Sequence, residues 1–353
     1  MNQGKITILA LLTILVMGLA ACENGTSAQG TVFTGGTNAL LFSYERDAPP
    51  DLIYDNSQTP FAIMLKARND GEFDTNNIRW RITGINRNDF ENLETGDVHD
   101  EVIMGRTKLQ DQVIEGQEDY IMLGDNICYG RSLAGGGELR DLSVTAHMCY
   151  AYATLATATV CIRENYLDGG DGCDPRTSSQ ISVSGAPVTV TGFSQQAVGT
   201  NRLRLQFDVA LRNNHRIWAP YEGQTCSEGK DRSSRIAERD RIYARIDTNG
   251  IGGIECVTLR DAEDFDGGYV LSDAYPQDLL SASAIRVQRV GVEDDGYFQL
   301  GSDNRASIIC TLEVDGDLTD SLGTVDLALS YFLEDTVTTP LTITHTGGPP
   351  GTC

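Results

Sequence analysis

Hydrophobic and polar residues alternate along several segments of this chain. Residues 78–82 place Ile78, Trp80 and Ile82 at every second position, with Arg79 and Arg81 between them. The same period of two runs through Leu203–Arg212 and through Val325–Tyr331. Because a strand points successive side chains to opposite faces, each segment predicts a half-buried β-strand, with Trp80 in the core.

Acidic turns containing glycine separate the predicted strands. Asp and Asn side chains bond back to their own backbone and Gly adopts positive φ, so these clusters predict tight turns. Many short strands with turns at this spacing are typical of sandwiches, so we expect an all-β fold. The turns are 69–71, 168–172, 266–268, 294–296 and 315–317.

A short internal repeat suggests the domain organisation. Met64–Gly71 and Val209–Asn214 both read as strands that end in Arg-Asn before a turn, and each follows another predicted strand, at 39–44 and 187–193. About 330 residues are more than a single hydrophobic core usually serves, so two domains are expected. We therefore predict two tandem immunoglobulin-like β-sandwiches, disulfide-braced, at 31–179 and 180–346, followed by a C-terminal tail at 347–353.

The strand that ends in Asn69-Asp70-Gly71 resembles the opening of immunoglobulin-like adhesion modules of the CARDB type. The second copy, Asn213-Asn214-His215, lacks the glycine of that turn. A group of uncharacterised secreted proteins of uncultivated archaea is also similar over most of the chain. That resemblance implies a surface location and no known active site. It rests on 40–43, 47–50, 149–152, Cys161, Cys173 and 185–188.

The N-terminus has the features of an export signal. Lys5 precedes an uncharged apolar run, Ile6–Ala21, which is too short to span a bilayer comfortably. Leu19-Ala20-Ala21-Cys22 resembles the lipobox of prokaryotic lipoproteins, which implies cleavage after residue 21 and a diacylglycerol on Cys22. Two acyl chains give stable anchoring. Residues 22–30 then form a lipid-anchored flexible tether; an ordinary signal peptide with a spare thiol is the alternative.

The cysteine count agrees with export. Nine cysteines include Cys22, and the remaining eight suit disulfides in an oxidising compartment. None forms a CxxC pair, and eight cysteines allow 105 pairings. Pairing neighbours within a module predicts Cys128–Cys149, Cys161–Cys173, Cys256–Cys310 and Cys226–Cys353.

The net charge of −23, from 50 acidic and 27 basic residues, argues against nucleic-acid binding. Affinity for nucleic acid depends on cations that neutralise phosphates. The same charge disfavours docking on anionic lipid headgroups, so the lipid on Cys22 would have to provide the anchoring.

Candidate chemistry is sparse. No HExxH, GxSxG or phosphate-cradling motif occurs, and His147 on an alternating strand reads as structural. Trp218, beside Pro220, is either a packed loop anchor or part of a binding surface. We expect no cofactor and no catalytic residue. Calcium is the one ligand to weigh, because acidic oxygens alternate in two turns, at Asp264, Asp266, Asp315 and Asp317.

These features favour a surface-displayed, lipid-anchored binding or adhesion protein that is not an enzyme. Its partner would be a surface protein or a glycan, presented with loops that commonly carry recognition. A structural subunit of an envelope or filament, built by edge-strand pairing and self-association, is the alternative. A hydrolase that uses acidic residues is a more remote one.

Overall fold

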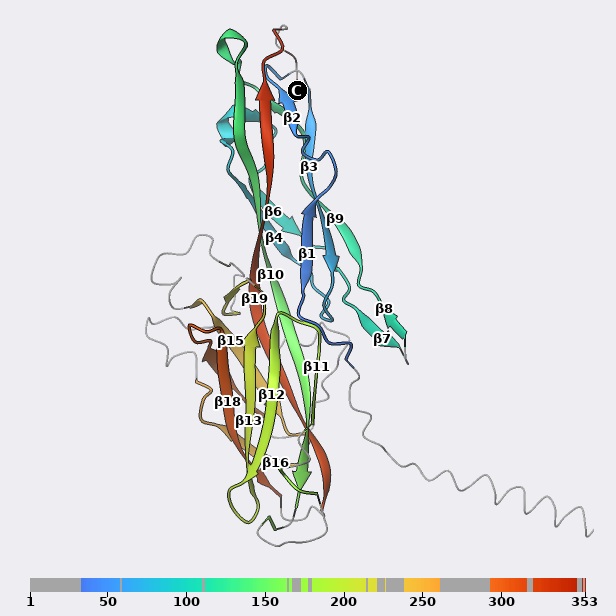
Figure 1. Cartoon of the computed structure of the whole chain (residues 1–353), viewed down its shortest axis with the longest axis vertical. Coiled ribbons are helices and arrows are strands. Elements are labelled where there is room, and N and C mark those ends of the chain that lie inside the picture. The colour runs from blue at the N-terminus through green and yellow to red at the C-terminus, as the bar shows by residue number, and fades with distance from the viewer. Residues whose placement is uncertain are drawn as a thin grey trace, which may run out of the picture. The chain divides into compact units, whose positions relative to one another are not determined.

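The computed structural model describes most of the chain after residue 32. The described residues are 33–57, 59–109, 112–163, 165–166, 173–176, 180–213, 215–220, 226, 238–260, 293–315, 320–347, 351 and 353. Phe33–Cys353 form one compact unit. The predicted signal peptide and Cys22 lie outside the described residues. The described part is built from antiparallel β-sheets, with one parallel strand pair, which confirms the all-β sandwich prediction (Figure 1).

Two four-stranded sheets have the same internal order. The first runs β1 (Leu40–Tyr44), β3 (Phe61–Asn69), β9 (Glu118–Tyr129), β5 (Phe90–Glu91), and the second runs β12 (Val188–Ala197), β13 (Arg202–Leu211), β18 (Arg305–Val314), β16 (Gly252–Cys256). Burial alternates along β3 and β13, as the period of two requires. The order corresponds to the ABED sheet of immunoglobulin-type sandwiches.

A nine-stranded sheet covers both of these sheets. Its path is β17 (Glu293–Gln299), β15 (Arg241–Asp247), β19 (Ser321–Thr344), β10 (Glu138–Ile162), β4 (Ile78–Thr83), β6 (Gly96–His99). Three short strands join beside this path: β11 (Gln180–Val183) on β10, and β14 (Arg216–Trp218) and β2 (Leu52–Tyr54) on β19.

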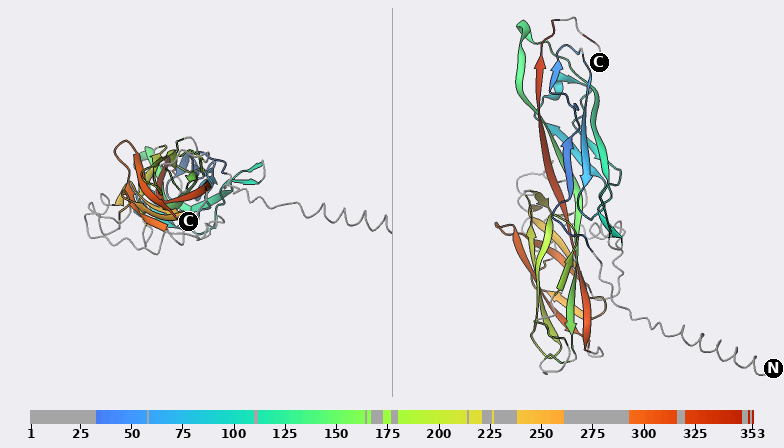
Figure 2. Two further views of the ribbon diagram at one scale, coloured as in Figure 1. Left: turned by 90° about the horizontal axis from the view of Figure 1, so that it is seen from below. Right: turned by 45° about the vertical axis from the view of Figure 1, so that its right-hand side comes forward.

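The long strands β10 and β19 connect the two sandwiches. They pair from Glu138 with Thr344 to Ile162 with Ser321, and they lie side by side in Figure 1 and in the right-hand view of Figure 2. β4 joins β10 at Thr145–Cys149, whereas β15 joins β19 at Asp326–Ser330. Each sandwich therefore uses one half of both strands, and the buried side chains form one continuous core.

Three fully buried tyrosines occupy the middle of that core. The Tyr150 hydroxyl donates to Asp335 (2.6 Å), and the Tyr331 hydroxyl lies 3.0 Å from that of Thr154. The Tyr152 hydroxyl donates to the Asn69 amide oxygen (3.3 Å). Burial raises the pKa of all three phenols well above the usual value, and the carboxylate of Asp335 adds to the effect on Tyr150.

The turn after β3 fits closely against these tyrosines. A Cβ on Gly71 would lie 1.9 Å from the Tyr152 hydroxyl, so this position needs glycine for space. The adjacent Glu72 carboxylate accepts hydrogen bonds from the backbone N–H groups of Thr34, Gly35 and Gly185. Segments at the start, the first third and the middle of the chain are thereby joined where the two sandwiches meet.

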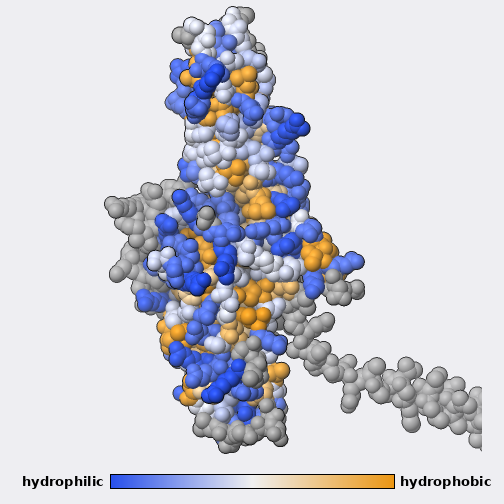
Figure 3. All heavy atoms as spheres, viewed as in Figure 1, coloured by the Kyte–Doolittle hydropathy of each residue, from blue (hydrophilic) through white to orange (hydrophobic). Residues whose placement is uncertain are grey.

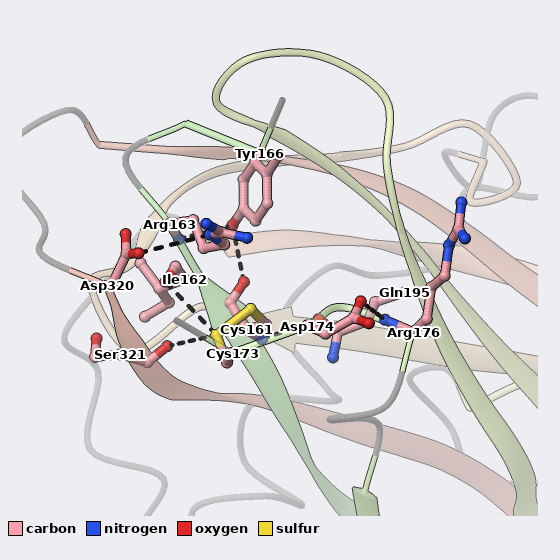
Figure 4. Close-up of a disulfide and its surroundings, with 10 residues drawn as sticks. All are labelled: Cys161, Ile162, Arg163, Tyr166, Cys173, Asp174, Arg176, Gln195, Asp320 and Ser321. Carbon is pink, nitrogen blue, oxygen red and sulfur yellow. Dashed lines mark hydrogen bonds and ion pairs between the residues drawn. A yellow bond between two sulfur atoms is a disulfide. The ribbon is translucent and has the colours of Figure 1, made fainter. Parts of the chain in front are cut away.

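All eight cysteines after Cys22 form disulfides. Cys161–Cys173 and Cys256–Cys310 are present as predicted. Figure 4 shows the first at the end of β10, where the Tyr166 hydroxyl donates to the Cys161 carbonyl (2.8 Å) and burial raises the Tyr166 pKa to about 12.

The other two predicted disulfides are wrong. The structure pairs Cys128 with Cys353 and Cys149 with Cys226. Cys128 is buried near the end of β9, in the first four-stranded sheet, whereas Cys149 points outward from the nine-stranded sheet. The sandwich core separates these two sequence neighbours, so they cannot meet.

Candidate functional site

The outer face of the nine-stranded sheet in the first sandwich is the best candidate for a binding site. The β4 residues Ile78, Trp80 and Ile82 are 0%, 5% and 5% exposed and face the core, as predicted for Trp80. Because strand side chains alternate, Arg79 and Arg81 face outward. Arg79 is exposed and Arg81 half-buried.

The strand register places these arginines in two rows across the sheet. Arg81 is opposite Gly96 of β6 and His147 of β10, and His147 is in turn opposite Thr336 of β19. Arg79 is opposite Val98 on one side and Cys149 on the other.

His147 is surrounded by hydroxyl groups. Its Nε2 lies 2.8 Å from Thr83 Oγ1, and its Nδ1 lies 3.3 Å from Thr336 Oγ1. The hydroxyls of Thr145 and Thr338 approach each other to 3.1 Å on the same face. These groups can both donate and accept hydrogen bonds, so the face suits a ligand rich in oxygen atoms.

The row through Cys149 continues to a carboxylate that already has a partner. Glu334 of β19 is opposite Cys149 and, on its other side, Arg216 of β14. Its Oε2 accepts a hydrogen bond from Trp218 Nε1 (2.8 Å), and Glu334 is only 7% exposed. Arg216 is exposed. The face therefore presents three guanidinium groups, of Arg79, Arg81 and Arg216, around one buried acid.

Trp218 itself is not part of an exposed binding surface. It is 3% exposed and packs against Ala151, Cys226 and Phe332. Of the two interpretations that the sequence left open, the structure supports the packed anchor, placed in β14 rather than in a loop.

A histidine and two carboxylates gather at the edge of the first sandwich. His99 closes β6, Asp119 lies in β9, and His99 Nε2 is 2.9 Å from Asp119 Oδ2. One potential ligand atom from each of these residues and from Glu101 lies within 4.8 Å of the others. Such a set could hold a divalent cation, and the His99–Asp119 contact also joins β6 to β9. No sequence spacing indicated this cluster, because it depends on contact between two sheets.

The predicted calcium ligands are mostly beyond the described residues. Asp264, Asp266 and Asp317 lie outside them. Asp315 is exposed directly after β18, where its backbone N–H donates to Ile251 O (3.1 Å). Within the described part of the chain, Asp315 is not a member of a group of possible metal ligands.

A polar groove lies beside β5 and β9, with a volume of about 670 Å³. Its walls carry both charges, Arg87 against Glu94 and Asp125, and the asparagines Asn88 and Asn92. This mixture fits no single ligand class, in contrast to the arginine face.

The fold is that of a disulfide-braced β-sandwich protein, and Arg79, Arg81 and Arg216 lie on the outer face of its nine-stranded sheet. A scan against models of known protein families finds no match, and a search of curated protein sequences finds none either.

Proposed function

We propose that this chain is a surface-displayed, lipid-anchored binding protein without catalytic activity, and that the arginine face binds an anionic glycan. The observation that carries the proposal is the gathering of Arg79, Arg81 and Arg216 on one outer face of a chain whose net charge is −23. Guanidinium groups bind carboxylates and sulfates through paired, charge-assisted hydrogen bonds. The neighbouring threonine hydroxyls and His147 suit the hydroxyl groups of a sugar.

The compartment supports this proposal. Four disulfides indicate an oxidising, extracellular-type environment. Within the described residues, no helix has the length and apolar character needed to cross a membrane. Lipid attachment at Cys22 remains a prediction from the sequence. The resemblances to CARDB-type modules and to secreted proteins of uncultivated archaea also remain predictions.

Most edge strands of the sheets are short or covered, which favours a binding protein over a filament subunit. β6 has four residues, β1 and β16 have five each, and β17 is bridged by Arg260 at Tyr297, whereas β12, at one edge of the second four-stranded sheet, has ten. Short or covered edges are poor templates for pairing between chains, so β12 is the edge through which a filament subunit would pair. Sedimentation at rising concentration tests this: a filament subunit associates, and the proposed receptor stays monomeric.

The binding proposal is tested on a glycan array with sulfated, uronic-acid and neutral sugars. We expect binding to the anionic sugars that weakens as NaCl rises. Replacing two charge-assisted contacts in Arg79→Ser/Arg81→Ser should weaken binding tenfold or more. Arg204→Ser is the control, because Arg204 is an exposed strand arginine of the second sandwich. Equal loss in the control, or preference for neutral sugars, contradicts the proposal.

The anchor is tested separately by Cys22→Ser. This variant should fold with its disulfides intact and remain in the soluble fraction, whereas the unmodified chain should float with membranes after a high-salt wash. A Cys22→Ser protein that still floats would show that the anchor is elsewhere.

A further inference from the structure

The hairpin of β7 (Thr107–Leu109) and β8 (Gln112–Ile114) exposes apolar side chains on both faces. All six strand residues are exposed, and Leu109, Val113 and Ile114 retain 66%, 47% and 51% of their accessible surface. Leu109 pairs with Gln112, and Thr107 with Ile114, so Leu109 and Ile114 share one face while Val113 lies on the other. Figure 3 shows a hydrophobic patch at the position that Figure 1 gives to this hairpin.

Exposed apolar side chains concentrate in this part of the molecule. Within the described residues, 14 large hydrophobic side chains are exposed, and five of them lie between Val102 and Ile114: Val102, Met104, Leu109, Val113 and Ile114. Scattered single residues of this kind need no explanation, but a local concentration marks a surface that contacts something apolar. An isolated two-stranded hairpin is also marginally stable in water.

The base of the hairpin lies against Gly35, close to Phe33, the first described residue. Arg106, the residue before β7, donates from Nη2 to the Gly35 carbonyl (2.8 Å). Glu72 fixes the backbone of Thr34 and Gly35 beside it. Cys22 precedes Phe33 by 11 residues, which span at most about 40 Å when extended. A membrane that holds a lipid on Cys22 is therefore within reach of the hairpin.

The hairpin is also locally neutral. Arg106 and Lys108 balance Asp111 and Glu115 within a chain whose net charge is −23. This segment can thus approach lipid headgroups without the repulsion that the rest of the chain experiences.

We propose that the β7–β8 hairpin inserts Leu109, Val113 and Ile114 into the interfacial region of the membrane that carries the lipid anchor. The inference rests on the proposed anchoring at Cys22. Lipid can surround a ribbon that exposes apolar side chains on both faces, whereas a flat protein surface covers only one. The unpaired backbone groups at the two edges of the ribbon limit insertion to the hydrated headgroup and upper acyl zone. The hairpin then fixes how the sandwiches are oriented on the membrane.

The test uses the lipidated full chain, expressed with its leader and reconstituted in phosphatidylcholine vesicles with brominated acyl chains. Leu109→Trp places a fluorophore on the hairpin, and Val257→Trp is the matched control at an exposed apolar position after β16, 72% exposed. The two native tryptophans, Trp80 and Trp218, are 5% and 3% exposed and give a constant background. We expect the added emission to be quenched by half or more in Leu109→Trp and to be unchanged in Val257→Trp.

Each other outcome overturns the inference in a recognisable way. If the protein floats with the vesicles but both added tryptophans are quenched equally little, the anchor holds and the hairpin does not insert. If the protein does not float, the anchoring proposal fails, and the hairpin proposal fails with it. If the emission of Leu109→Trp shifts to the blue with protein concentration alone, a second copy of the chain covers the hairpin instead.

Discussion

Glu72 accepts a hydrogen bond from the backbone N–H of Gly185, which lies 113 residues further along the chain. The same carboxylate accepts the backbone N–H groups of Thr34 (2.7 Å) and Gly35 (2.9 Å). One carboxylate thus accepts hydrogen bonds from three backbone N–H groups where the two sandwiches meet. In most proteins such backbone groups are paired within secondary structure.

Replacing this carboxylate should destabilise the whole unit. In Glu72→Gln the side-chain amide can accept at one oxygen, but its NH₂ group faces a backbone donor. We expect the free energy of unfolding to fall by about 1.5–3 kcal/mol, the range for hydrogen bonds to a charged group. Urea denaturation measures this. Glu118→Gln is the control, because Glu118 forms an exposed ion pair with Lys66 (2.7 Å) and should cost less than about 1 kcal/mol.

Much of the strand content followed from the sequence because alternation reports burial on one face. The patterns at 78–82 and 203–212 correspond to β4 and β13, and 325–331 lies in the first half of β19. The two segments of the repeat, which end in Asn69 and Asn213, occupy equivalent positions in the two four-stranded sheets. β3 lies between β1 and β9 in the first four-stranded sheet, as β13 lies between β12 and β18 in the second.

The shared strands could not be predicted in the same way. From Tyr150 to Ile162, β10 is buried at nearly every position, so the alternation that would identify a face is lost. Its pairing with β19 joins residues more than 150 positions apart, and no local signal encodes that register. The arginine face is a direct consequence: alternation showed that Arg79 and Arg81 point away from the core, but only the sheet order places His147 beside Arg81 and Arg216 in the same row as Arg79.

The disulfides differ in the length of chain that they close. Cys128–Cys353 joins residues 225 apart, whereas Cys161–Cys173 joins residues 12 apart. Because a cross-link restricts the unfolded chain more when its loop is longer, removing the first pair should cost about 2.5 kcal/mol more than removing the second. Paired Cys→Ser variants, compared by guanidinium unfolding, measure the difference. A larger cost for Cys161→Ser/Cys173→Ser would show that local packing at the end of β10 dominates.

The buried tyrosines predict sensitivity to alkali. Burial raises the pKa of Tyr150, Tyr152 and Tyr331 above the usual value of 10.0, so the folded state keeps these protons when the unfolded state loses them. Stability from these groups is complete below pH 10 and falls as pH rises above it. Phenolate absorbance, followed with circular dichroism, should show late ionisation that coincides with unfolding. Ionisation of all 13 tyrosines in a chain that remains folded would contradict the buried core.

Asp55 predicts a complementary loss of stability in acid. It is fully buried and bonds to His345 Nδ1 (2.7 Å) and to the backbone N–H groups of Leu133 (2.8 Å) and Thr346 (3.3 Å), which ties the end of β19 to the first sandwich. Burial alone raises the pKa of this carboxyl, but the hydrogen bonds from His345, Leu133 and Thr346 outweigh it and hold the pKa below its usual value of 3.8.

A lowered pKa means that this stabilisation is complete above pH 3.8 and disappears as pH falls through the pKa of the folded state. Asp55→Asn should therefore lower the free energy of unfolding by roughly 1–3 kcal/mol at pH 7, and the difference from the unmodified chain should shrink in stronger acid. Urea denaturation across this pH range measures both effects. The control is Asp51→Asn, because Asp51 is exposed and offers only its backbone carbonyl, to Thr342 N–H (2.9 Å). If the loss of unfolding free energy in Asp55→Asn does not change with pH, the amide destabilises the protein because it does not fit the hydrogen-bonding site. The negative charge of Asp55 would then not be what holds the end of β19.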